Sequence, residues 1–209
     1  MNKVQRDEIL SLGAYEEIRE RFRAAVIAGK QQRRFQISDE MSIVFENHTT
    51  VLFQIQEMLR TERITREAAI QHELDTYNEL IPGDRELSAT LFVEIADRDT
   101  RERRLVELAG LEESFALDVD GEREPARNES RGVLPDRTTA VHYLKFPLSA
   151  KMAEKMALGS ATAELGGKVS ACPVVRLVVR HPRLELASAL PPEVVRAIGG
   201  DLLDSPPRT

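Results

Sequence analysis

Polar side chains that could bind a small molecule are concentrated between residues 46 and 78 of this sequence. A guanidinium group can donate two parallel hydrogen bonds to an anion, and Arg60 is the candidate for this role. A carboxylate, amides and an imidazole from neighbouring positions would complete a pocket for a small anionic or polar ligand. The candidate binding residues are Glu46, Asn47, Gln54, Glu57, Arg60, His72, Glu73, Tyr77 and Asn78.

A structural role for the same charges is the alternative. Glu57 or Glu46 would then form a buried ion pair with Arg60 that orients packed helices and binds no ligand. No residue of the sequence receives a catalytic role, so the question of enzymatic activity stays open. An enzyme of this sequence would have to use an unfamiliar pocket around Glu57, Arg60 and His72.

Two histidines could hold a metal ion under one condition. His142 lies in an alternating strand pattern, which is typical of a hydrogen-bonded core histidine, and His181 precedes a proline near a strand end. They would form a two-histidine metal site only if their strands were adjacent. We therefore expect neither a resident metal nor another cofactor.

Composition limits the classes of protein to which the chain can belong. A formal net charge of −6 argues against general nucleic-acid binding, although Arg33 and Arg34 leave a nucleic-acid-binding regulator as an alternative. Cys172 is the single cysteine, which excludes an internal disulfide and favours a reducing, cytoplasmic location. No apolar run has the length of a signal peptide core or a membrane span, so no membrane partner is expected.

Three amphipathic helices are expected in the first part of the chain. Apolar residues from Tyr15 to Val26 recur at spacings of three and four, which predicts one helical stripe. A second helix over about 50–64 is apolar on two sides, so its charged residues would be partly desolvated. A third helix over about 66–80 ends at a Pro-Gly-Asp step.

The hydrophobic period changes after residue 82. A strand over 88–96 is followed by a helix with a capping box formed by Asp99 and Glu102, and an Asp120-Gly121 step then predicts a tight hairpin turn. The same order of elements then repeats. The second set comprises a strand over 139–148, a helix over 149–158 and strands near 161–165 and 174–179. The chain then closes with an extended segment at 184–187 and a last helix that ends at Gly199-Gly200.

These elements predict an α+β fold. A helical lobe of about three helices, residues 1–82, would pack on a mixed or antiparallel sheet lobe, residues 83–204, with a disordered tail at 205–209. The repeated order of strand, helix and hairpin suggests an internal duplication of the sheet lobe. The two lobes are expected to fold as one cooperative unit.

Several runs of the sequence resemble a known bacterial family, domain of unknown function 3501. The runs are VFEN at 44–47, FQIQEMLR at 53–60, ELDTYNELIP at 73–82 and AVHYLKF at 140–146. The resemblance extends from about residue 15 to residue 202. It implies a cytoplasmic bacterial protein with no assigned activity, whose gene often lies near genes for rubrerythrin and iron–sulfur oxidoreductases.

The leading hypothesis is a noncatalytic binding or accessory protein that works beside redox or electron-transfer enzymes. Motifs for dinucleotides, nucleotide phosphates and serine nucleophiles are absent from the sequence. The expected partner is an oxidoreductase or iron–sulfur protein, as the family resemblance implies. Assembly into a homo-oligomer is compatible with the sequence but is not specified by it.

Overall fold

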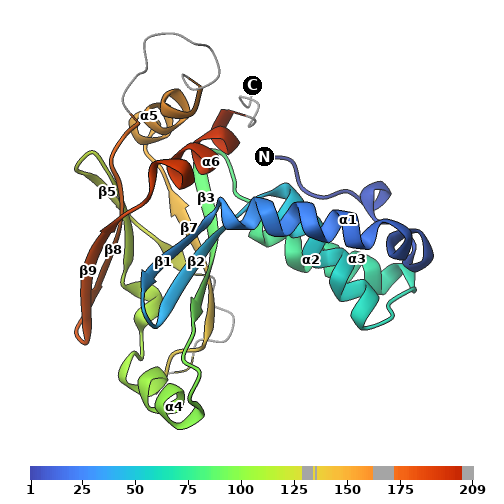
Figure 1. Cartoon of the computed structure of the whole chain (residues 1–209), viewed down its shortest axis with the longest axis horizontal. Helices are drawn as coiled ribbons and strands as arrows, with labels where there is room; N and C mark the ends of the chain where they lie inside the picture. Colours follow the sequence, from blue (N-terminus) through green and yellow to red (C-terminus); the bar gives the residue numbers. More distant parts are fainter. Residues whose placement is uncertain (129–133, 135, 162–171, 204–209) are drawn as a thin grey trace.

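The structure, a computed structural model, describes residues 1–128, 134, 136–161 and 172–203. A helical arm projects from a body built on two sheets (Figure 1). The α-helices of the described residues are α1 (Leu12–Gln31), α2 (His48–Thr61), α3 (Glu67–Tyr77), α4 (Arg98–Glu107), α5 (Ala150–Ala161) and α6 (Pro192–Leu203). Short 3-10 helices are η1 (Arg6–Glu8), η2 (Asn78–Leu80) and η3 (Leu111–Glu113).

Both sheets are antiparallel. The strands are β1 (Arg34–Ser38), β2 (Met41–Glu46), β3 (Glu86–Val93), β4 (Phe115–Val119), β5 (Glu122–Pro125), β6 (Arg127–Asn128), β7 (Val141–Pro147), β8 (Val175–His181) and β9 (Leu184–Ala189). Sheet A has the order β1-β2-β3-β7-β6, and sheet B has the order β5-β4-β8-β9. The predicted α+β class is therefore confirmed.

The order of one strand, one helix and two strands occurs twice in the described residues, although the second pair of strands is β8 and β9 and not the expected pair near 161–165 and 174–179. The series β3-α4-β4-β5 corresponds to the series β7-α5-β8-β9. The two first strands, β3 and β7, are neighbours in sheet A, and β4 and β8 are neighbours in sheet B. The two units thus meet strand to strand at the centre of both sheets.

Two separate hydrophobic clusters stabilise the fold. In the body, inward residues of sheet A such as Ile43 and Leu144 join residues of sheet B such as Leu117, together with Ile198 of α6. In the arm, residues of α2 and α3 pack with Val4 of the N-terminal segment. The outer face of sheet A, which carries the polar residues of β2 and β3, lies toward the arm.

The division of the chain differs from the expected one in its first half. Residues 34–46 form the hairpin β1–β2, and β2 pairs with β3 along its whole length. Two strands of sheet A therefore come from the segment that was expected to be helical lobe. The alternation of buried Phe35 and Ile37 with exposed neighbours gives β1 its strand character.

The start of α4 also differs from the expected position, while the hairpin turn is where it was expected. Asp97, not Asp99, caps α4, because its side chain accepts a hydrogen bond from Thr100 N at 2.8 Å. Asp120 and Gly121 have φ angles of 49° and 89°, which a type I′ hairpin turn requires. The strand expected near 161–165 lies outside the described residues, except that residue 161 is the last residue of α5.

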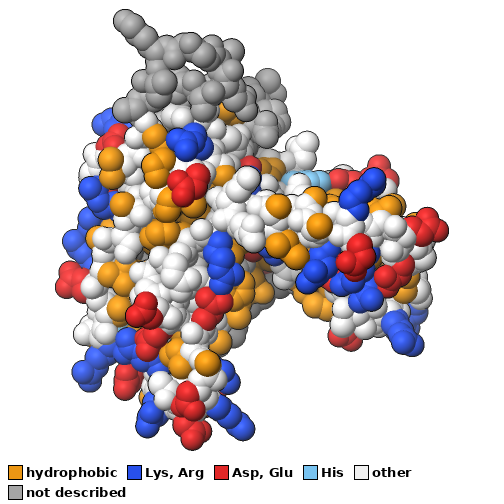
Figure 2. All heavy atoms as spheres, viewed as in Figure 1, with side chains coloured by type: hydrophobic (Ala, Val, Ile, Leu, Met, Phe, Trp, Pro, Cys, Tyr) orange, Lys and Arg blue, Asp and Glu red, His pale blue; other side chains and the backbone are white. Residues whose placement is uncertain are grey.

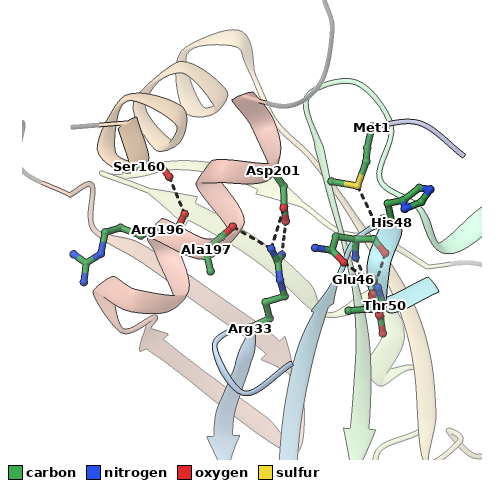
Figure 3. A network of polar contacts seen from close by, with 10 residues as sticks. Met1, Arg33, Glu46, His48, Thr50, Ser160, Arg196, Ala197 and Asp201 are labelled. Atoms are coloured by element: carbon green, nitrogen blue, oxygen red, sulfur yellow. Dashed lines mark hydrogen bonds and ion pairs between the residues drawn. The ribbon is translucent and has the colours of Figure 1, made fainter. Parts of the chain in front are cut away.

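The last helix does not end at Gly199-Gly200 but continues to Leu203. Gly199 allows α5 and α6 to pack closely where they cross, because a Cβ at this position would lie 2.5 Å from the carbonyl oxygen of Met156. Ser160 Oγ on α5 also donates a hydrogen bond to Arg196 O on α6 at 2.9 Å, as Figure 3 shows. The glycine pair is therefore a packing feature and not a helix stop.

Candidate functional site

Two of the candidate binding residues, Glu57 and Arg60, face α1. The Glu57 carboxylate accepts hydrogen bonds from the Tyr15 hydroxyl and from Nε and Nη2 of Arg19, each at 2.8 Å. One turn along α2, Arg60 Nε donates to Glu16 Oε1 at 2.5 Å. The charges on this side of α2 thus join it to α1.

The electrostatics of this cluster fit a structural clamp. The Arg19 guanidinium, followed by the Tyr15 hydroxyl, holds the pKa of Glu57 below its usual range, although partial burial opposes this. Burial raises the pKa of Tyr15, and the neighbouring Glu57 charge raises it further. The ion pair of Glu57 is formed with Arg19, which the sequence did not single out, rather than with Arg60.

A second group of candidate residues lies between α2 and α3. Gln54 approaches the Tyr77 hydroxyl, and burial followed by the charge of Glu73 raises the pKa of Tyr77. His72 is exposed on the far side of α3. The structure therefore brings Gln54, Glu73 and Tyr77 together but separates them from the Glu57 cluster.

Asn78 has a structural contact of its own. Its side chain is buried, its Oδ1 accepts a hydrogen bond from Val4 N at 2.8 Å, and its Nδ2 donates to Val4 O at 3.0 Å. These two bonds fix the N-terminal segment against the end of α3. Both polar groups of the amide are used in this way.

Glu46 lies at the end of β2, where the chain enters α2. Its carboxylate is buried and accepts hydrogen bonds from the hydroxyls of Thr50 and Thr90, the second at 2.7 Å. Asn47 is the N-cap of α2 and accepts a hydrogen bond from Thr50 N at 3.0 Å. The nine candidate residues are thus distributed over five places, with His72 exposed by itself on α3.

Three clefts contain members of the candidate set, and one of them, of about 350 Å³, is lined by Asn47. A cleft of about 270 Å³ lies between the C-terminal turns of α1 and the outer face of sheet A; we call it the α1–sheet cleft. Glu46 lines it together with Ile27, Lys30, Gln31, Arg34, Val44 and Phe92. A larger cleft of about 410 Å³, beside β6 and β7, is lined by Asn78 and by charged residues of both signs, among them Lys3, Glu86 and Lys145.

The basic pair Arg33 and Arg34 is held by carboxylates. Arg33 forms a bidentate ion pair with Asp201 on α6, with 2.9 Å between Nη2 and Oδ1 (Figure 3). Arg34 Nη2 donates to Glu94 Oε1 at 2.6 Å, and its guanidinium lies 5.8 Å from the centre of the Phe92 ring. Both cations thus have partners within the fold.

The two candidate metal ligands lie in different sheets. His142 Nε2 is 2.7 Å from Thr138 Oγ1, which in turn donates to Glu112 Oε2 at 2.9 Å. Burial lowers the pKa of His142, while the negative charge of Glu112 opposes this. His181 Nε2 instead donates to the carbonyl oxygen of Ala109 at 3.0 Å. Residues 1–128, 134, 136–161 and 172–203 contain no group of three or more metal-binding side chains.

Comparison with known proteins identifies the family. Residues 3–202 match the family described as "Protein of unknown function (DUF3501)". The chain belongs to this family. No curated protein matches the sequence significantly. A crystal structure described as a novel protein of unknown function from Burkholderia pseudomallei K96243 is 33% identical, with a TM-score of 0.85 over 96% of this chain and 100% of that one.

The predicted resemblance to DUF3501 is thus confirmed over nearly the whole chain. Among the helices that the structure describes, none is long and apolar enough to cross a membrane. Tyr15 and Arg19, which complete the Glu57 cluster, lie 42 and 38 residues away from it in the DUF3501 sequence. Only the apolar stripe that contains Tyr15 indicated that this face of α1 would be covered.

Proposed function

We propose that this DUF3501 protein is a noncatalytic binding protein that contacts a protein partner through its helical arm. The observation that carries the proposal is Leu10, which is 36% exposed and lies between η1 and the first turn of α1. Leu10 lies between two apolar hollows, each of about 210 Å³. An exposed apolar side chain with an apolar hollow on each side, as at Leu10, is typical of a surface that contacts another protein.

The lining of the hollows indicates the chemistry of the partner. The first hollow is lined mainly by apolar side chains of α1 and α2, including Ile18, Phe22 and Leu52. The second is lined mainly by apolar residues, including Leu59 of α2, Ile64 of the loop after α2 and Ile70 of α3. Hollows of this size each accept about one large side chain, which suits two successive apolar residues on one face of an amphipathic helix.

The partner that we propose is an oxidoreductase or iron–sulfur protein. The family resemblance supports this class, because it implies genes for such enzymes near members of the family. A helix on the surface of the enzyme would insert its apolar side chains on either side of Leu10. The DUF3501 protein would then act as an accessory subunit without chemistry of its own.

Replacing Leu10 with Asp should abolish this association. The change places a charge between two apolar hollows and leaves the backbone hydrogen bond from Leu10 N to Gln56 Oε1 in place. We expect at least a tenfold loss of copurifying oxidoreductase, which corresponds to about 1.4 kcal/mol of binding free energy. The measurement is affinity purification from the native host with quantitative mass spectrometry.

Val106→Asp is the matched control, because Val106 is 54% exposed on α4, in the body. It should retain the partner that the wild type recovers. Equal recovery of an oxidoreductase by Leu10→Asp would rule out the arm surface. Recovery of no oxidoreductase by the wild type under several growth conditions would rule out the proposed class of partner.

A further inference from the structure

Glu46 carries a buried negative charge that the fold does not neutralise. Glu46 is 4% exposed, and its carboxylate accepts hydrogen bonds from the neutral hydroxyls of Thr50 and Thr90. Among the residues that the structure describes, no Lys or Arg nitrogen lies within 4.0 Å of this carboxylate. Buried carboxylates are normally paired with a cation, because desolvation of a lone charge is costly.

The N-terminus of α2 offsets only part of this charge. Glu46 precedes the N-cap residue Asn47, so the positive end of the helix dipole favours a negative charge at this position. That end is equivalent to roughly half an elementary charge. The helix dipole therefore stabilises the Glu46 carboxylate in part, but no full positive charge of the described residues lies next to it.

The carboxylate lines the α1–sheet cleft, which is open to a ligand. Val44 and Phe92 form part of the cleft floor on the outer face of sheet A, and Ile27 of α1, 39% exposed, forms part of its roof. Figure 2 shows hydrophobic side chains gathered where the arm leaves the body. The cleft thus combines apolar walls with a buried anion.

A cation without a carboxylate partner lines the same cleft. Lys30, in the last turn of α1, has no carboxylate oxygen within 4.0 Å among the described residues. Arg34 also lines the cleft, but its guanidinium is occupied by Glu94 and by Ser42 Oγ, at 2.6 and 2.8 Å. One anion and one cation of the cleft are therefore available to a ligand.

We propose that the α1–sheet cleft binds an α-amino acid with an apolar side chain. The ammonium group of the ligand would pair with Glu46, its carboxylate with Lys30, and its side chain would contact Phe92 and the aliphatic walls. The volume of about 270 Å³ lies below the usual range for drug-sized ligands, which suits a molecule of this size. The inference does not depend on the proposed protein partner, because the cleft and the Leu10 surface share no lining residue.

Simpler ligands would leave one of the two charges without a partner. A carboxylic acid that lacks an amine would bring a second negative charge toward Glu46, and like charges repel. An amine that lacks a carboxylate would pair with Glu46 but not with Lys30. The affinity should therefore fall from amino acid to amine to acid.

Methyl NMR and calorimetry of the full chain can test the proposal. L-Leucine, L-valine and L-phenylalanine at about 10 mM, well above a Kd of about 1 mM, should shift the methyl signals of Ile27 and Val44. Leucinamide should bind about tenfold more weakly than L-leucine, because it retains only the ammonium contact. The acid 4-methylpentanoate should show no saturable binding.

Two substitutions separate the roles of the charges. Glu46→Gln should weaken L-leucine binding at least tenfold; the amide can still accept from Thr90 and donate to Thr50, whose hydroxyl also reaches Asn47 O at 3.0 Å. Lys30→Met should reduce L-leucine binding to the level of leucinamide and leave leucinamide binding unchanged. Lys30 has no described side-chain partner to lose, so this variant tests the site even if Glu46→Gln does not fold.

Glu112→Gln is the matched control, because Glu112 is also buried and bonded to a threonine hydroxyl but lies outside the cleft. It should bind L-leucine as the wild type does. The proposal is overturned if none of the three amino acids shifts the Ile27 and Val44 signals. Equal L-leucine affinity of the wild type and the Glu46→Gln or Lys30→Met variant would also overturn it.

Discussion

Replacing Gly199 with Ala should destabilise the protein by up to about 2 kcal/mol, although alanine is the better helix former. The new methyl group would lie 2.5 Å from Met156 O, a backbone atom that can move only if α5 moves. This overpacking costs about 1–3 kcal/mol, against a gain of about 1 kcal/mol from helix propensity. The melting temperature should fall by a few degrees, roughly 2–4 °C for each kcal/mol in a chain of this size.

Gly29→Ala is the control, and its effect on the free energy of unfolding should have the opposite sign. Gly29 also lies inside a helix, but a Cβ there would meet nothing within 4 Å. We expect stabilisation of up to about 1 kcal/mol from helix propensity alone. Gly200→Ala should have a smaller effect than Gly199→Ala, because its nearest neighbour is the Ser160 hydroxyl at 3.3 Å. Destabilisation of equal size at all three positions would contradict a close crossing of α5 and α6.

Gly199 also shows why local sequence rules fail at some positions. A glycine pair near the end of an apolar stripe is typical of a helix stop, and the sequence alone offers no reason to prefer another role. The role of Gly199 is determined by the packing of α5 against α6, which brings together residues about forty positions apart in the sequence. A rule that considers only neighbours in the sequence cannot anticipate such a contact.

The strand β1 could have been predicted, in contrast. Phe35 and Ile37 alternate with polar residues, which is a strand signal. The neighbouring Arg33 and Arg34 favoured a different interpretation, the end of a helix, because cations are also typical of a helix C-terminus. Longer elements with a clear period, such as α3 and β7, were predicted to within a few residues because burial of one face alone specifies them.

The need of the charged residues of α2 for partners was predicted for the same physical reason. The two-sided apolar pattern of α2 indicated that its charged residues would be partly desolvated and would need partners. The structure gives Glu57 and Arg60 such partners on α1. The identity of these partners could not be predicted, because many charged residues of α1 have equivalent spacing. Glu46 is the candidate for which a ligand is still proposed.

Replacing Glu57 with Gln should destabilise the arm by about 1–2 kcal/mol near neutral pH. The change removes the negative charge that receives two hydrogen bonds from Arg19 and one from Tyr15. The Arg19 and Glu57 side chains are 19% and 25% exposed, so water replaces these bonds only in part. Urea denaturation of the wild type and the variant measures the difference.

The effect of Glu57→Gln should depend on pH with a defined sign. Because the pKa of Glu57 is lowered in the folded protein from its ordinary value of 4.5, the carboxylate stabilises the fold above that value. The stabilisation disappears as the pH falls through the lowered pKa. The wild type should therefore lose more stability than the variant between about pH 5 and pH 2, and the two unfolding curves should converge.

Glu67→Gln is the matched control for this prediction. Arg6 and Glu67 form the same kind of bidentate pair, with distances of 2.6 and 2.9 Å, but their side chains are 43% and 67% exposed. Exposed pairs contribute little to stability, so this variant should unfold close to the wild type at neutral pH. If Glu57→Gln and Glu67→Gln have equally small effects, the Tyr15–Arg19–Glu57 cluster does not hold α1 to α2, and the pairing of these helices must depend on apolar contacts and on the Arg60–Glu16 pair.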